Sequence, residues 1–202
     1  MKKYILLQSL LIFLLQCDSN SISISDNNQC YDVICEENNS NFLLQISVSM
    51  TPYDNQDFEE IVDSENYFGV HVDATDGYDA DYDILESPNG PSSWVSLYFP
   101  HAEWSHPLGN NFTQDVKGNF FDSGPDKIVQ WMFNVESNIY GTINLSFATI
   151  DDYCYECIKS IKIISEDDIY TSYDMNFNEI NISRFLQQNQ ILSFNLLVEF
   201  NQ

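Results

Sequence analysis

Apolar and polar residues alternate with a period of two along much of this chain. The clearest run lies close to the C-terminus and consists of Leu192, Phe194, Leu196, Val198 and Phe200. The same pattern recurs in residues 44–50, 129–135 and 143–147. Such alternation puts apolar side chains on one face of a strand and polar ones on the other. We therefore expect an all-β chain in which these segments face a shared dry interior.

Shorter strand candidates and turn signals lie between these runs. The candidates are residues 67–73, 94–99, 159–165 and 180–185. The Gly- and Pro-containing segments 87–91 and 122–126 interrupt the strands, and Tyr140-Gly141 is typical of a hairpin turn. Helical periodicity is nearly absent, with room for a turn or two only at residues 56–62. Many short strands separated by turns predict an antiparallel two-sheet sandwich, immunoglobulin-like or jelly-roll-like.

The first sixteen residues have the three-part pattern of a secretory signal. Lys2 and Lys3 form a positive n-region, and the mostly apolar segment Tyr4–Leu15 follows. That segment is too short to span a bilayer, and the rest of the chain has no run of about 20 apolar residues. We therefore expect residues 1–16 to be removed and the protein to work outside the cytoplasm.

The end of this signal resembles a bacterial lipobox, in which a cysteine is acylated and becomes the new N-terminus. The matching residues are Leu14-Leu15-Gln16-Cys17, and Gln16 departs from the Gly, Ala or Ser of that pattern. The resemblance implies a lipid on Cys17. The polar, Ser- and Asn-rich stretch that follows is suited to a tether, so we expect the anchor cysteine and tether over residues 17–40 and the β-sandwich domain over residues 41–202. Several acyl chains make a stable membrane anchor. The alternative is ordinary cleavage near Cys17, so we expect either a cell-surface or outer-membrane lipoprotein or a secreted protein.

The mature chain is strongly acidic. Removing residues 1–16 takes away two of seven basic side chains and none of 31 acidic ones, so the formal charge goes from −24 to −26. This charge argues against nucleic acid and anionic lipid surfaces as partners, because both are polyanions. It is compatible with cation binding or with a solvated acidic surface. A hydrophobic content of 44% and an aromatic content of 14% exclude a disordered acidic tail.

Four cysteines remain if Cys17 is lipidated, and they form two close pairs, Cys30 with Cys35 and Cys154 with Cys157. In an exported protein such pairs indicate disulfides first. A tetrahedral zinc site or redox chemistry is the alternative. Local pairing and cross-pairing between the N-terminal segment and the late strands both stay open.

The densest polar feature is an aspartate-rich segment that also contains Gly77. Its acidic residues are Asp73, Asp76, Asp79, Asp81 and Asp83. Like charges repel, so such a loop needs solvent or a bridging cation, and calcium prefers six to eight oxygen ligands. The spacing is not that of an EF-hand. The loop is therefore a candidate calcium site, with aspartates that cap their own turns as the alternative.

This segment is also part of a wider pattern. Five segments together resemble a β-sandwich module of bacterial secreted and surface proteins. In chain order they are Tyr67-Phe68-Gly69-Val70, Asp73–Asp79, Tyr98-Phe99-Pro100, Trp131–Val135 and Gly141–Ser146. The resemblance covers about residues 42–200 and implies that fold without any known activity. Two prolines that are adjacent in the module are separated here, as Pro88 and Pro91, and the cysteines are not part of its pattern.

No arrangement of residues in the sequence identifies a reaction, so we favour a protein without catalytic activity over an enzyme. The sequence has no nucleophile elbow and no phosphate-binding glycine loop. His101, Glu103 and His106 have metal-ligand chemistry without zinc-motif spacing. Trp94 and Trp104 are candidates for stacking on sugar rings, although aromatic residues of this kind also form cores. We therefore expect a binding or structural surface module that recognises a glycan or a surface protein, with a carbohydrate-binding or carbohydrate-active protein as the alternative.

Overall fold

The computed structural model describes residues 41–53, 59–118, 128–150, 153, 155–165, 168–173, 180 and 182–201. The expected signal peptide, Cys17, and the tether lie outside this range, as do Cys30, Cys35 and Cys154. The described residues form strands and one short 3-10 helix, so the all-β prediction is confirmed. Within the same residues no helix has the length and apolar character needed to cross a membrane.

The strands follow one another along the chain with a single short helical turn after the fourth. Their bounds are β1 Phe42–Pro52, β2 Ile61–Val70, β3 Ile84–Leu85, β4 Val95–Pro100, η2 Ala102–Trp104, β5 Asn111–Lys117, β6 Ile128–Ser137, β7 Gly141–Thr149, β8 Ile158–Ser165, β9 Asp168–Tyr173, β10 Ile182–Leu186 and β11 Ile191–Phe200.

These strands form one continuous sheet, not two separate ones. The hydrogen-bonded order is β10-β7-β1-β2-β5-β4-β6-β11-β8-β9, and β3 pairs with β5. All pairings are antiparallel except that of β2 with β5. β4 joins the two halves, because Val95–Tyr98 pair with β6 while Phe99 and Pro100 pair with β5. The sheet is therefore mixed, and the prediction of two antiparallel sheets is not confirmed.

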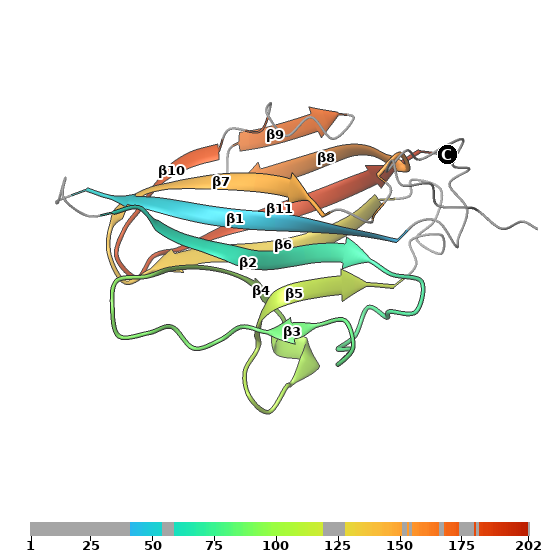
Figure 1. Ribbon diagram of the computed structural model, residues 1–202, viewed down its shortest axis with the longest axis horizontal. Coiled ribbons are helices and arrows are strands. Elements are labelled where there is room, and N and C mark those ends of the chain that lie inside the picture. Colours follow the sequence, from blue (N-terminus) through green and yellow to red (C-terminus); the bar gives the residue numbers. More distant parts are fainter. Residues whose placement is uncertain are drawn as a thin grey trace, which may run out of the picture.

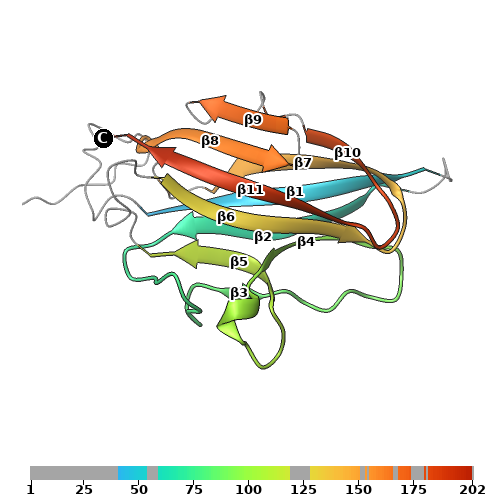
Figure 2. The ribbon, with the colours of Figure 1, turned by 180° about the vertical axis from the view of Figure 1, so that it is seen from behind.

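The sheet folds back on itself, so that β1, β2 and β7 face β6, β11 and β8 (Figures 1 and 2). Aromatic rings from the two halves meet between them. Phe42 of β1 lies 6.2 Å from Trp131 of β6 and 5.8 Å from Phe200 of β11, centroid to centroid. Phe68 of β2 lies 5.3 Å from Trp131. This interior is the dry space that the alternating segments were expected to share.

The long alternating runs are confirmed as core strands. Alternate residues of β1 from Phe42 to Met50 are buried, and Phe194, Leu196, Val198 and Phe200 of β11 are buried as well. Leu192 is half-buried and packs against the same core. Alternation therefore identified both the strands and the face that each turns inward.

Three local predictions need correction. β6 and β7 do not form a hairpin, since β6 pairs with β4 and β11 while β7 pairs with β1 and β10, so residues 138–140 cross between the halves. Ile61 and Val62 begin strand β2 instead of ending a helical turn; residues 54–58 lie outside the described range. The strands β3, β5 and β9 were not expected, because their short segments carry no clear alternation.

The two ends of the hydrogen-bonded path, β9 and β10, lie near each other (Figures 1 and 2). Arg184 of β10 forms an ion pair with Asp168 of β9, and its guanidinium donates to the hydroxyl oxygen of Tyr170 at 2.5 Å. Arg184 is the only arginine in the sequence. Its side chain therefore bridges two edges that share no backbone ladder.

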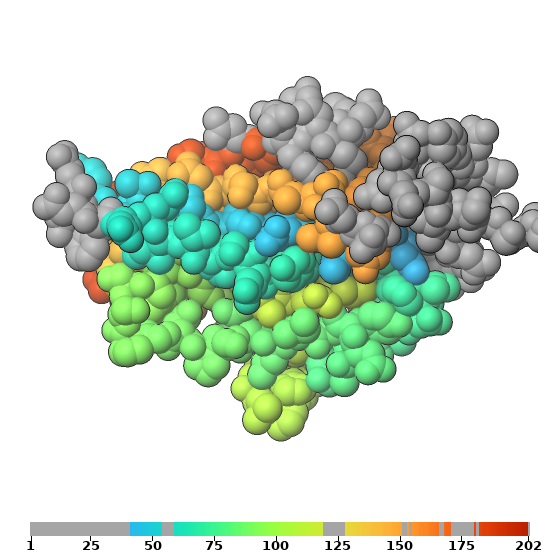
Figure 3. Space-filling model, in the orientation of Figure 1, coloured from blue at the N-terminus to red at the C-terminus, as the bar shows by residue number. Residues whose placement is uncertain are grey.

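The loops between β2 and β5 gather on one side of the molecule, next to β2 (green in Figure 3). Gly69 lies near the end of β2, just before these loops begin, and the backbone of β1 comes very close to it. A Cβ at Gly69 would lie 2.2 Å from the carbonyl oxygen of Phe42, so only glycine allows this approach. At Gly90 the nearest atom to an added Cβ, a serine hydroxyl, is 3.9 Å away.

We expect Gly69→Ala to lower the free energy of unfolding by about 2 kcal/mol or more, because β1 and β2 must separate to admit the methyl group. Urea unfolding monitored by tryptophan fluorescence measures the loss. The matched control is Gly90→Ala, which should stay within about 0.5 kcal/mol of the wild type. Equal stabilities of the two variants would show that β1 and β2 do not approach in this way.

Candidate functional site

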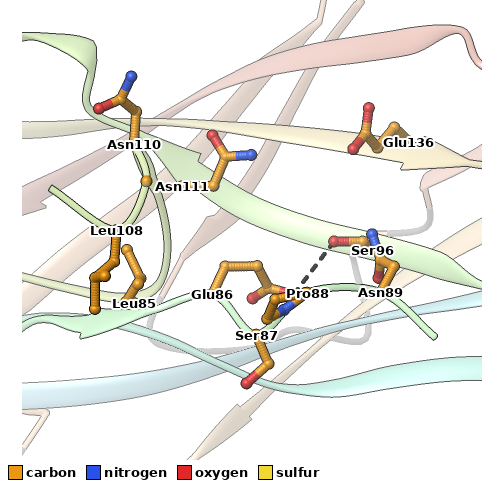
Figure 4. Close-up of a pocket in the computed structure, with 11 residues that line it drawn as sticks. Leu85, Glu86, Ser87, Pro88, Asn89, Ser96, Leu108, Asn110, Asn111 and Glu136 are labelled. Atoms are coloured by element: carbon orange, nitrogen blue, oxygen red, sulfur yellow. Dashed lines mark hydrogen bonds between the residues drawn. The ribbon is translucent and has the colours of Figure 1, made fainter. Parts of the chain in front are cut away.

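A cleft of about 380 Å³ lies on the outer face of β4, beneath the loops that flank β3 and β5. Its walls come from four regions of the chain (Figure 4). Its lining residues are Leu85, Glu86, Ser87, Pro88, Asn89, Ser96, Leu108, Gly109, Asn110, Asn111 and Glu136. Small-ligand sites are usually concave and carry a few polar groups at fixed positions.

Strand pairing places two carboxylates in this cleft. Ser96 of β4 is the cross-strand partner of Glu136 on β6, so both side chains project from the same face. Glu86 follows β3, and its backbone N–H donates to the carbonyl oxygen of Asn111 at 2.9 Å. The Ser96 hydroxyl donates to Oε1 of Glu86 at 3.4 Å (Figure 4). Glu86 and Glu136 therefore both lie close to Ser96.

Both carboxyl groups are harder to ionise than ordinary glutamates. Burial, with the nearby charge of Asp63 adding to it, raises the pKa of Glu86 to about 7. Burial also raises the pKa of Glu136. In the part of the chain that the structure describes, no lysine, arginine or histidine lines the cleft to offset these charges. Near neutral pH Glu86 therefore exists in both forms, and its carboxyl group can donate or accept a hydrogen bond.

Half-buried and buried polar side chains of β2 and β5 lie near Glu86, and among them Asp63 and Thr113 act on its carboxyl group. Asp63 of β2 accepts a hydrogen bond from the backbone N–H of Leu97 at 2.7 Å, on the edge of β4 that β5 leaves unpaired. Thr113 of β5 donates to Oδ1 of the fully buried Asn66 at 3.0 Å. The Asp63 side chain thus replaces a missing ladder bond where the two halves of the sheet diverge.

The remaining lining groups alternate between polar and apolar. Asn89, Asn110 and Asn111 carry side-chain amides, which both donate and accept hydrogen bonds. Leu85, Pro88 and Leu108 add apolar surface at the same opening. The cleft therefore suits a ligand with many hydroxyl or amide groups and some exposed C–H surface.

The aspartate-rich loop before β3 is organised largely by its own carboxylates. Asp79 accepts from the backbone N–H of Thr75 at 2.6 Å, and Asp83 accepts from the backbone N–H groups of Asp79 at 2.7 Å and Val116 at 3.0 Å. Asp83 is buried, and this burial raises its pKa to about 6. Two of the five predicted ligands therefore act as turn caps, the alternative that the sequence left open.

The other three aspartates of this loop, Asp73, Asp76 and Asp81, are exposed to solvent. Among the described residues, no group of three or more His, Cys, Asp or Glu side chains is arranged to hold a metal ion. Calcium binding at this loop stays a prediction.

The two tryptophans proposed for sugar stacking lie at opposite ends of β4. Trp94 precedes the strand and Trp104 follows it, so about 20 Å of extended chain separates them. Both are half-buried, and Trp104 stacks on the ring of His101 with centroids 3.5 Å apart and planes 1° apart. The structure does not bring these two rings together in one groove.

His101 contacts the nearby glutamate and a buried aspartate. Its Nδ1 lies 2.7 Å from Oε1 of Glu103, and its Nε2 lies 2.8 Å from Oδ2 of Asp115. Asp115 lies on β5 and is 1% exposed. His106 contacts the ring of Tyr78 instead, at 4.8 Å, so the two histidines do not form a shared ligand set.

Sequence reasoning missed Glu86, Glu136 and Asp115. Each is one acidic residue among 31, and nothing local distinguishes it. Their importance arises from burial, which depends on loops distant in the sequence. Of the expected cysteine pairs only Cys157 is described; it is buried, and the pairing stays a prediction.

No family model matches the chain, and no curated protein or solved structure matches it either. Function must therefore be argued from the geometry of the cleft and its surroundings.

We expect Glu86→Gln to stabilise the protein at pH 8 by on the order of 1 kcal/mol. This is less than the full pKa shift would give, because water still reaches the carboxylate and screens its charge. Because the folded pKa of Glu86 is raised, its contribution is favourable at low pH and is lost as pH rises from about 4.5 through about 7. The variant and the wild type should converge near pH 5. Urea unfolding between pH 5 and pH 8 measures the difference, and a difference independent of pH would contradict this explanation.

Proposed function

We propose that this protein is an extracytoplasmic binding module, held at a membrane through Cys17, which binds carbohydrate in the cleft at Glu86 and Glu136. The observation that carries the ligand class is the lining of the cleft, in which carboxylates, amides and a serine hydroxyl surround apolar surface from Leu85, Pro88 and Leu108. Sugars present hydroxyl groups at their edges and C–H groups on their faces. Ordered polar groups at fixed positions give such a pocket its specificity.

Several further features support this proposal. The core between the facing halves of the sheet suits the β-sandwich surface module that the sequence resembles. Disulfide pairing of the cysteines, Cys157 among them, belongs to the same proposal and fits an oxidising compartment outside the cytoplasm. The net charge of −24 fits a ligand that is neutral or cationic. Calcium at the loop 73–83 would stiffen a region adjoining the cleft, and it belongs to the same proposal.

A carbohydrate-active enzyme is the second candidate. Glycoside hydrolysis uses two carboxyl groups, an acid with a raised pKa and an ionised partner, and this cleft holds Glu86, whose pKa burial raises to about 7, together with Glu136. The binding module is preferred because burial raises the pKa of Glu136 as well as that of Glu86, whereas hydrolysis needs one of the two carboxyl groups ionised.

We expect the mature domain to bind a subset of neutral or amino sugars on a glycan array. Glu136→Gln should weaken binding of the best sugar at least about tenfold in titration calorimetry, because it removes a charged acceptor. Glu60→Gln, an exposed residue outside the cleft, is the matched control and should bind like the wild type. Equal loss in both variants, or no glycan bound, would reject the cleft as a sugar site. Release of free sugar from a bound oligosaccharide would favour the enzyme.

We expect intact-mass spectrometry of the protein from a bacterial membrane fraction to show a mature chain that begins at Cys17 and carries acyl chains. Cys17→Ser should move the protein to the soluble fraction without altering its fold, because the residue lies outside the β domain. A mature chain with an unmodified Cys17 would contradict anchoring and favour free secretion.

A further inference from the structure

Both ring nitrogens of His101 are occupied by carboxylates. Nδ1 faces Glu103 at 2.7 Å and Nε2 faces Asp115 at 2.8 Å. A carboxylate only accepts hydrogen bonds, so each of these contacts needs an N–H on the imidazole. A neutral imidazole has one N–H, whereas an imidazolium has two. The geometry therefore selects the protonated ring.

The surroundings of His101 reinforce its positive charge. Asp115 of β5 is buried, and its second oxygen, Oδ1, has no hydrogen-bond partner. The charge of Asp115 contributes to the raised pKa of Asp83, in the loop before β3. Trp104 lies parallel to the imidazole at 3.5 Å, where an aromatic face attracts a cation. On this side a proton on His101 offsets two acidic groups that water does not reach.

The remaining titratable groups around this site lie on the solvent side. Glu103 belongs to η2 and is largely exposed, and Lys117 at the end of β5 lowers the pKa of Glu103 together with His101. Tyr78 and His106 contact the aromatic rings next to His101, Trp104 and Phe112. The buried carboxylate of Asp115 is therefore the group that depends most on the proton.

The same histidine begins one wall of the cleft. Its backbone N–H donates to the carbonyl oxygen of Asn110 at 2.7 Å, so residues 102–110 leave β4 and return to β5 at one point. Leu108, Gly109 and Asn110 of this segment line the cleft. Trp104, in the middle of the segment, rests on the imidazole. The ring contact with Trp104 and the backbone hydrogen bond to Asn110 therefore connect His101 to the wall at two points.

We propose that His101 is a proton-operated latch, which holds the 102–110 wall against the cleft when its ring is charged and releases the wall when the proton is lost. This inference rests on the proposed function, because it concerns regulation of the same cleft. Loss of the proton removes one of the two ring hydrogen bonds and leaves Asp115 as a buried anion beside Asp83. An unpaired buried charge is strongly unfavourable, so the segment opens to solvate it.

The direction of the pH response follows from these contacts. Burial alone lowers the pKa of His101, but the hydrogen bonds and charges of Asp115 and Glu103 outweigh it, so the pKa lies above the ordinary value. The stabilisation that the charged His101 ring gives the folded protein is then fully present below about pH 6.5. It is lost as the pH rises through the higher pKa that His101 has in the folded state. Ligands would be held in a closed cleft in acidic surroundings and exchanged in alkaline ones.

Hydrogen–deuterium exchange of the mature protein between pH 6 and pH 9 tests the latch, after correction for base-catalysed intrinsic exchange. We expect protection of the peptide covering residues 101–111 to fall at least about tenfold across this range, while protection of β11 stays constant. His101→Gln, which carries no proton switch, should show protection of 101–111 that does not change with pH. Constant protection in the wild-type protein would overturn the proposal.

NMR titration of the imidazole signals tests the latch in the wild-type protein, so the test does not depend on whether the His101→Gln variant folds. His71→Gln and His106→Gln assign the three histidine signals, and the His101 signal should titrate above pH 6.5. Titration below that value would overturn the latch. Neither measurement uses a ligand, so the two proposals are tested separately. A failed glycan screen would reject carbohydrate binding without bearing on the latch. Constant protection of residues 101–111 would reject the latch without bearing on carbohydrate binding.

Discussion

Trp131 joins the apolar core to the polar network beside the cleft, and both halves of the molecule depend on it. Its ring packs against Phe42 and Phe68 of the facing half. Its Nε1–H donates to the carbonyl oxygen of Asp115 at 3.2 Å. The strand that carries His101's buried partner is therefore held in register by a core side chain. Packing of the two halves thus sets the position of a charged group.

The cleft exists because β4 belongs to both halves of the sheet. Its residues Val95 to Phe99 are all buried, so loops cover the face that does not point into the core. Those loops place Glu86 over Ser96 and remove water from its carboxyl group. The same crossing leaves the backbone N–H of Leu97 without a ladder partner, and the carboxylate of Asp63 accepts its hydrogen bond. A topological junction therefore becomes a polar site with shifted pKa values, a common location for function.

Cations are scarce in this chain, and the structure uses them at defined points. Arg184 bridges the edge strands through Asp168 and Tyr170. Lys159 and Lys162 both contact Glu199, whose pKa is lowered by them. None of these groups reaches the cleft. In the cleft a proton on Glu86 removes a negative charge, and next to it a proton on His101 makes the ring positive beside Asp115, so both places are sensitive to pH.

The sequence by itself determined the strands and their inward faces, because a period of two is a local property that each segment carries alone. Residues 44–50 and 192–200 are the clearest cases, and both are core strands. It could not determine that residues 138–140 cross between halves or that β2 and β5 run parallel, since pairing depends on the whole chain. For the same reason the sequence did not distinguish Asp83 from the other four aspartates of its segment, because Asp83 becomes buried only when the loops fold. Burial of Glu86, Glu136 and Asp115 arises where distant segments meet, so only the tertiary structure decided where the chemistry lies.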